Sequence, residues 1–156
     1  MENKNSKTLH IILSFVFIAV VAGLGSLFVN LGMDWFNALS KPTQWIPNIV
    51  IPIVWTVIYI AFAVINFFWI KNSSIPKTTW ILMIVNGILN ILWCLIFFTL
   101  KQTFLGNIVI ILNLIAGILL WISIYRTKKL YAYILSIYPI WLSIATTLNL
   151  ATWILN

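Results

Sequence analysis

Few side chains in this sequence carry groups suited to acid–base or metal chemistry. The 156 residues include one histidine, His10, one cysteine, Cys94, and two acidic residues, Glu2 and Asp34. No pair of carboxylates, no His/Cys cluster and no glycine-rich phosphate loop can be assembled from them. The sequence therefore predicts no conventional catalytic centre and no metal site. A single cysteine also excludes an intrachain disulfide.

The polar groups that remain are amides and indoles inside apolar segments. Residues three and four apart share one face of a helix. Three such faces each join a tryptophan to at least one asparagine: Pro52, Trp55, Tyr59, Phe62 and Asn66; Asn86, Asn90, Trp93 and Phe97; and Trp141, Ala145, Asn149 and Thr152. An amide that faces lipid without a partner is costly. We therefore expect the three faces to turn inward, towards one another.

The depth of these residues predicts a shared cavity. Counted from the outer ends of their segments, three lie about two turns in and three about three turns in: Trp55, Trp93 and Asn149, then Tyr59, Asn90 and Ala145. Indole and phenol rings beside amides favour a cavity for a planar aromatic ligand. In the alternative interpretation the asparagines only join helices, through hydrogen bonds that average about 0.6 kcal/mol each.

Five long apolar segments must position these faces. A membrane-spanning helix needs roughly 20 mostly apolar residues. Segments without a charged residue satisfy this at about 9–28, 49–70, 79–100, 104–125 and 131–155. Hydrophobic residues make up 63% of the chain and charged residues only 7%, so lipid is the expected solvent. The predicted fold class is an all-α membrane protein, a five-transmembrane-helix bundle that forms one domain over residues 1–156.

The basic residues predict an orientation. The net charge is +7, but the lysines and arginine lie singly or in pairs between apolar runs, which argues against a nucleic-acid partner. Seven of the nine fall in the N-terminus, the second loop and the fourth loop, and only Lys41 and Lys101 fall on the other side. This bias predicts a cytoplasmic N-terminus and an outer C-terminus, in a bacterial or archaeal cytoplasmic membrane.

The first connecting segment differs from the other loops. Residues 30–48 form a long stretch rich in aromatic residues and proline, with Trp35, Phe36, Lys41, Pro42 and Trp45. Long ordered loops are more often functional than simple connections. We therefore expect this loop to cover the outer end of the cavity.

Taken in order along the chain, these motifs resemble the TspO/MBR family, the tryptophan-rich sensory or translocator proteins. The resemblance spans almost the whole chain. It rests on four stretches: Trp35-Phe36-x-x-Leu39-x-Lys41-Pro42, Pro52-x-x-Trp55-x-x-x-Tyr59, Asn86-x-x-x-Asn90-x-x-Trp93 and Trp141-x-x-x-Ala145-x-x-Leu148-Asn149. Each stretch alone is a weak signal, whereas all four in this order on five apolar segments are specific.

The resemblance implies a function and a site. It implies a homodimeric protein that binds porphyrins such as protoporphyrin IX, in a cavity among the first, second, third and fifth helices. The ligand-binding residues expected from it and from the helix faces are Trp55, Tyr59, Asn86, Asn90, Trp93, Trp141, Ala145 and Asn149, with Trp35, Phe36, Lys41 and Pro42 as a lid. The porphyrin is a ligand, and no resident cofactor is expected. Porphyrin transport or export, and light-dependent porphyrin degradation, are the alternatives.

Two departures from the family pattern affect these expectations. In the first loop Gln44 holds the place of the family's aromatic residue and Trp45 follows it. On the fifth segment Pro139 lies two residues before Trp141, whereas the family has its proline four residues before, so any helix kink is expected to be displaced. The family's sterol motif is not carried over, because no basic residue follows Asn149.

Overall fold

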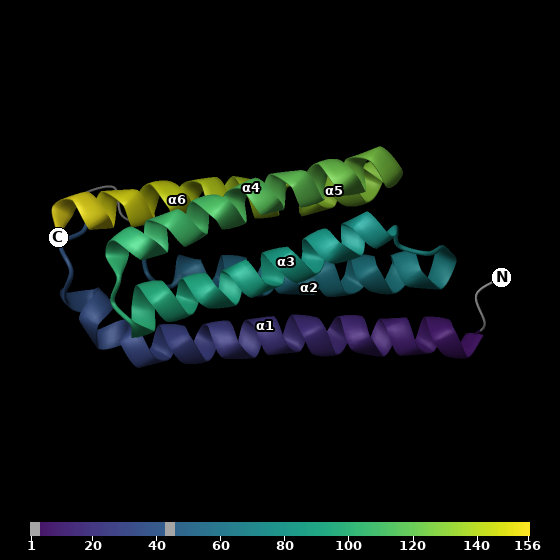
Figure 1. The fold of residues 1–156 in the computed structure, drawn as a ribbon, viewed down its shortest axis with the longest axis horizontal. Helices are drawn as coiled ribbons and strands as arrows, with labels where there is room; N and C mark the ends of the chain where they lie inside the picture. The colour runs from purple at the N-terminus through teal and green to yellow at the C-terminus, as the bar shows by residue number, and fades with distance from the viewer. Residues whose placement is uncertain (1–3, 43–45) are drawn as a thin grey trace.

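The computed structural model describes residues 4–42 and 46–156, and over these residues the chain is helical, with no strand. The elements run from one end of the chain to the other as follows (Figure 1): α1 (Lys4–Ala38), α2 (Val50–Asn72), α3 (Lys77–Cys94), the π-helical turn η1 (Leu95–Thr99), α4 (Thr103–Thr127), α5 (Lys129–Leu135) and α6 (Ile137–Leu155).

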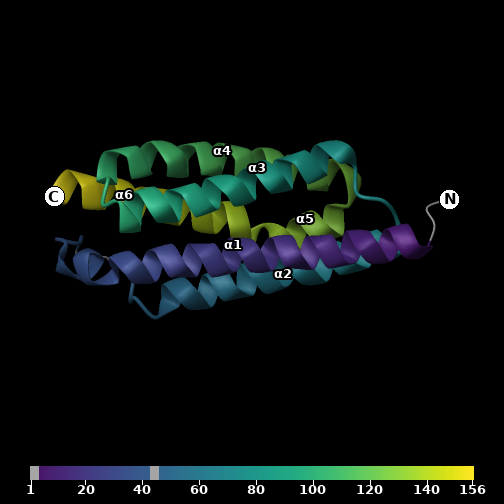
Figure 2. The same ribbon diagram turned by 60° about the horizontal axis from the view of Figure 1, so that its bottom comes forward.

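The helices lie side by side along one common direction, and the two ends of the chain lie at opposite ends of the bundle (Figure 1). Helix α4 packs mainly against α3 and α6, whereas α1 packs against α2, α3 and η1. Figure 2 shows α1 and α2 together on one side of the bundle, with α3 and α4 on the other.

The predicted fold class is confirmed. Five helical spans are long and apolar enough to cross a membrane: Lys4–Ala38, Val50–Asn72, Lys77–Thr99, Thr103–Thr127 and Lys129–Leu155. Large apolar side chains are exposed along all of them, as with Leu13 on α1 and Ile111 on α4. Such surfaces are stable in hydrocarbon and not in water. The chain is an integral membrane protein.

The predicted boundaries of the first helix are wrong, above all at its C-terminal end. The expected helix ended near residue 28 and the expected loop began at Asn30, but α1 continues to Ala38. Close packing holds the extra turns in place. An added Cβ on Gly32 would lie 2.1 Å from the Phe98 carbonyl oxygen, so only glycine permits this approach to η1. One turn further on, Phe36 is buried against Phe97 and Phe98.

The third and fifth spans are each interrupted; the third was expected to be continuous, and the fifth was expected to have a displaced kink near Pro139. The third span ends in η1, where Leu100 N–H donates to Leu95 O at 2.9 Å in place of a regular α-helical bond. The fifth span breaks at Ser136, between α5 and α6. Pro139 explains this second break, because its missing N–H leaves the Leu135 carbonyl without a helical donor. The break therefore lies three residues before the proline.

Candidate functional site

A cavity of about 460 Å³ lies between α1, α2 and the end of α3. Its walls include four residues expected at the site, together with a face of α1, the first helix, for which the sequence had named no lining residue. The lining residues include Gly25, Phe36, Trp55, Tyr59, Asn90 and Trp93. The cavity is several times larger than two small neighbouring cavities of about 40 and 50 Å³.

The absence of a side chain at Gly25 makes room on the α1 side. An added Cβ there would lie 3.6 Å from Cys94 Sγ and 3.9 Å from the Tyr59 hydroxyl, which are ordinary contact distances. The backbone of α1 therefore forms the cavity wall directly at this level. Further along α1, Val29, Met33 and Phe36 continue the same wall.

Aromatic rings form the opposite side. Trp55 stacks on Tyr59 one turn further along α2, with ring centroids 5.8 Å apart, and lies 6.4 Å from the Trp93 ring. The Trp93 ring is held by a hydrogen bond, in which its indole Nε1 donates to Asn149 Oδ1 at 3.1 Å. The rings are therefore held in place before any ligand arrives, which lowers the entropic cost of stacking a ligand on them.

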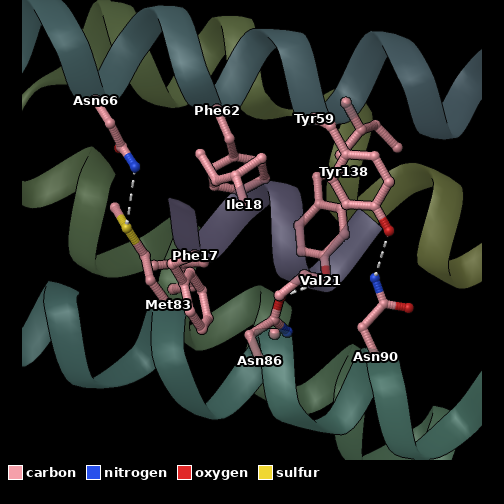
Figure 3. Close-up of a pocket in the computed structure, with 13 residues that line it drawn as sticks. Phe17, Ile18, Val21, Tyr59, Phe62, Asn66, Met83, Asn86, Asn90 and Tyr138 are labelled. Atoms are coloured by element: carbon pink, nitrogen blue, oxygen red, sulfur yellow. Dashed lines mark hydrogen bonds between the residues drawn. The ribbon is translucent and has the colours of Figure 1, made fainter. Parts of the chain in front are cut away.

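Asn90 closes the inner end of the cavity together with Tyr59. Its Nδ2 donates to the Tyr59 hydroxyl at 3.3 Å (Figure 3). The other end of the same amide, Oδ1, is buried and has no hydrogen-bond partner among the described residues. Both residues also line the small 50 Å³ cavity that continues inward past Phe62 and Asn66. The Tyr59–Asn90 pair thus separates the large cavity from the small one.

The residues expected on the fifth segment do not line the large cavity. Trp141, Ala145 and Asn149 line the separate 40 Å³ cavity, which also touches Trp55 and Trp93. All three are buried, with exposed fractions of 5%, 8% and 3%. They therefore face the bundle interior, as the helix faces indicate, but they lie behind the aromatic wall and not in front of it.

Asn86 joins helices, which is the alternative interpretation of the asparagines. Its Nδ2 donates to Asn113 Oδ1 at 2.8 Å and to the Asn113 carbonyl at 3.1 Å. Its Oδ1 accepts from the Tyr138 hydroxyl (Figure 3). Asn149 similarly donates to Asn107. Asn86 and Asn149 therefore connect α3, α4 and α6, whereas Asn90 borders the cavity.

The expected lid residues are only partly in a loop. Trp35 and Phe36 belong to α1, which corrects their assignment to the first loop. Trp35 packs edge-on against Phe97 at 5.8 Å, and Phe36 lines the cavity. Lys41 follows in the loop and places Nζ 4.6 Å from the Phe36 ring centroid, and the neighbouring Pro42 is half-buried. The displaced Trp45 lies outside the described residues.

The sequence reasoning missed the partners on α4 and the first turn of α6. Asn107, Asn113 and Tyr138 are all buried and hydrogen-bonded to residues of the predicted faces. The signal was present for α4, because Asn107, Ile110 and Asn113 follow the same three-residue spacing that marked the other helices. An amide inside an apolar span indicates a partner there even without a tryptophan beside it.

The cavity wall combines aromatic rings with polar groups. Among the residues the structure describes, no three His, Cys, Asp or Glu side chains lie close enough to hold a metal ion. The cavity offers ring faces on Trp55, Tyr59 and Trp93, and one unpartnered amide oxygen on Asn90. This set can stack on a flat molecule and accept one hydrogen bond from it.

One protein-family model matches a range of residues that includes the whole site. The model of the TspO/MBR family matches residues 13–154. The match runs from the first span to the last and includes every cavity residue named above. Among curated proteins, no match was found.

Proposed function

The chain belongs to the TspO/MBR family, and from this membership and the cavity together we propose that it binds porphyrins, such as protoporphyrin IX, within the membrane. The binding site proposed is the cavity between α1, α2 and α3. The ligand class is the one that the sequence resemblance implies. What supports it in this chain is the size, the lining and the opening of the cavity.

The size of the cavity supports a ligand larger than a single aromatic ring. Binding cavities for small molecules and cofactors have volumes of about 300–1,000 Å³, and this one measures about 460 Å³. The two small cavities nearby, at about 40 and 50 Å³, are too small for such a ligand. The proposed ligand therefore occupies the α1–α2–α3 cavity and not the space beside Trp141.

The lining supports a flat ligand with its own donors. Trp55 and Trp93 present ring faces, and aromatic stacking contributes about 0.5–1.5 kcal/mol beyond the area buried. The unpartnered Oδ1 of Asn90 is an acceptor, and the pyrrole N–H groups of a metal-free porphyrin are donors. Pairing the two would remove the cost of leaving that buried oxygen unsatisfied. Lys41, at the loop end of α1, provides a positive charge for a propionate.

The cavity also has a route by which an apolar ligand can enter. Several lining residues at its rim are exposed on the outer surface of α1 and α2, among them Ser26, Thr56 and Ile60, of which Ile60 is 58% exposed. The rim therefore faces the hydrocarbon of the membrane. A porphyrin dissolved in the membrane can reach the cavity from the side.

The topology proposed for the membrane follows from charge. Seven of the nine basic residues lie in the first turns of α1 or at the helix ends and connections between α2 and α3 and between α4 and α5, at the end of the bundle where α1 begins. We place this end in the cytoplasm. The cavity, which reaches Asn48 and Pro52 at the start of α2, then lies in the outer half of the membrane. A homodimer is proposed from the resemblance alone.

The observation that carries the proposal is the pair of fixed rings, Trp55 and Trp93, on a cavity of about 460 Å³. The test is a titration of the purified protein with protoporphyrin IX, followed by the Soret band, which does not depend on the number of tryptophans. The Trp55→Leu variant should bind several-fold more weakly. Trp153→Leu, which changes an exposed tryptophan near the C-terminus, is the matched control. Equal affinity in wild type and Trp55→Leu would contradict the proposal.

A further inference from the structure

A further cavity lies at the opposite end of the bundle, near the start of α1. It measures about 190 Å³ and is formed by the start of α1, the end of α2, the following loop and the start of α3. Its lining residues are His10, Ile70, Ser74, Ile75, Lys77 and Trp80. None of them lines the porphyrin cavity proposed above.

The surroundings of this cavity are positively charged. Lys77 lies in its wall, and Lys7 lies near the end of α2, where its Nζ donates to the Lys71 carbonyl at 3.3 Å. The one acidic residue that the structure describes, Asp34, is on the same helix as His10 but about 36 Å further along it, at 1.5 Å per residue. Positive charge at this end is therefore not balanced by a carboxylate among the described residues.

The walls combine hydrogen-bonding groups with apolar ones. Ser74 and His10 add polar groups to the Lys77 ammonium, whereas Ile70, Ile75 and the Trp80 ring form the rest. Helix α3 begins at Lys77, and no side chain caps it, so the positive end of its dipole adds to the same field. The volume equals that of about six water molecules at roughly 30 Å³ each. A phosphate group with part of a glycerol fits this space.

The cavity lies at the depth in the membrane where lipid headgroups are found. It lies where three spans end, and Trp80 is the type of residue that marks the boundary between membrane and water. Immediately below it, Leu13 on α1 and Ile81 on α3 are exposed, at 54% and 50%. A molecule bound here by its phosphate can therefore lay apolar chains along the lipid-facing surface of α1 and α3.

We propose that this cavity binds the phosphate of an anionic phospholipid headgroup. Basic cavities between the ends of transmembrane helices suit such headgroups, because the charge attracts the anion and the membrane supplies it at high local concentration. Lys77 pairs with the phosphate, Ser74 and His10 contact it, and the Trp80 ring packs against the glycerol. The site is separate from the porphyrin cavity and does not depend on that function.

The test compares lipid classes on the purified full-length protein in detergent. Native mass spectrometry measures the binding of phosphatidylglycerol, of phosphatidylcholine and of inorganic phosphate, and thermal unfolding is followed in parallel. Phosphatidylglycerol should bind more tightly than phosphatidylcholine and raise the melting temperature. Lys77→Gln should weaken its binding about fivefold, because one basic residue near a lipid headgroup is worth about that factor.

Two matched variants distinguish lipid binding in this cavity from unspecific attraction of the lipid by basic residues elsewhere. Lys129→Gln removes a basic residue at the same end but outside the cavity, where Nζ lies over the Tyr125 ring. Lys101→Gln removes one at the other end. Both should bind phosphatidylglycerol as the wild type does. An equal loss in Lys129→Gln, or equal binding of phosphatidylcholine, would overturn the proposal. Binding of inorganic phosphate as tight as that of phosphatidylglycerol would overturn the lipid assignment.

Discussion

The indole Nε1 of Trp93 donates to Asn149 Oδ1 at 3.1 Å, so the aromatic wall of the large cavity is held from behind by the fifth span. Asn149 in turn donates to Asn107 on α4. A chain of hydrogen bonds thus runs from the ring of α3 through α6 to α4. The fifth span shapes the cavity although its predicted residues do not line it.

Asn149→Leu should destabilise the protein. The change leaves the Trp93 indole N–H and the side-chain oxygen Oδ1 of Asn107 buried without partners, and each unsatisfied buried group costs about 1–3 kcal/mol. Unfolding in mixed micelles should show a loss of about 2–6 kcal/mol for the two groups together, with weaker porphyrin binding because the Trp93 ring is no longer held. Asn72→Leu, at the exposed end of α2, is the control and should change neither. Unchanged unfolding of Asn149→Leu would show that the bond contributes nothing.

Gly25→Leu should block the large cavity. A Cβ at residue 25 would meet Cys94 and Tyr59 at ordinary contact distances, and the rest of a leucine side chain would then occupy the space beside Gly25 that a ligand needs. Porphyrin affinity should fall at least tenfold while the protein stays folded. Gly23→Leu is a matched control two residues away, because nothing lies within 4 Å of its added Cβ. Equal binding by both variants would mean that the ligand sits elsewhere.

Gly32→Ala tests the close approach that extends α1. The new methyl would lie 2.1 Å from the Phe98 carbonyl oxygen, so α1 and η1 must move apart. Overpacking of this kind costs about 1–3 kcal/mol, and the thermal midpoint in detergent should fall accordingly. Gly23→Ala should leave the midpoint unchanged or raise it slightly, since alanine favours a helix over glycine. A Gly32→Ala protein as stable as the wild type would contradict the packing described for α1.

The sequence predicted the five spans because the free-energy cost of placing a residue in hydrocarbon depends mainly on the type of that residue. Hydrocarbon excludes charges and unpaired amides, so apolar length and the spacing of Asn90 and Trp93 were enough to identify helices and their inner faces. The same rule placed Trp141 and Asn149 inside the bundle, where they are buried. The sequence did not predict which residues each inner face contacts.

The residue at which α1 ends and the set of residues that line the cavity could not be predicted from the sequence, because both depend on packing between distant segments. Asn30 and Asp34 made the end of α1 look like a loop, but Gly32 against the Phe98 backbone keeps it helical. The cavity wall at Gly25 arises from a missing side chain, which no pattern of polar residues reveals. Whether an asparagine borders a cavity or pairs with another helix is decided by the partner it meets, as Asn113 shows for Asn86.

Trp141→Phe separates the observed cavity from the predicted one. Trp141 is buried beside the small 40 Å³ cavity, and its Nε1 has no hydrogen-bond partner among the described residues. Phenylalanine keeps a ring there and removes the unsatisfied N–H, so the stability should change little. Porphyrin affinity should equal that of the wild type, measured by the same Soret titration as for Trp55→Leu. A loss as large as that of Trp55→Leu would move the ligand towards the fifth span.

Asn90 and Asn86 lie one helical turn apart on α3, and their substitution by leucine should have opposite consequences. Asn86→Leu leaves the Tyr138 hydroxyl and Asn113 Oδ1 without their partner, so it should lower the unfolding free energy by about 2–6 kcal/mol, at about 1–3 kcal/mol for each group.

Asn90→Leu breaks a single bond of 3.3 Å to Tyr59 and also removes a buried oxygen that has no partner among the described residues. The two effects offset each other, so stability should stay close to that of the wild type. Porphyrin affinity should fall about two- to tenfold, the equivalent of one hydrogen bond. Parallel unfolding curves and Soret titrations of the two variants would check this. If Asn86→Leu lost affinity while remaining fully stable, the roles assigned to the two amides would be reversed, because the ligand would then contact the amide that the structure pairs with α4.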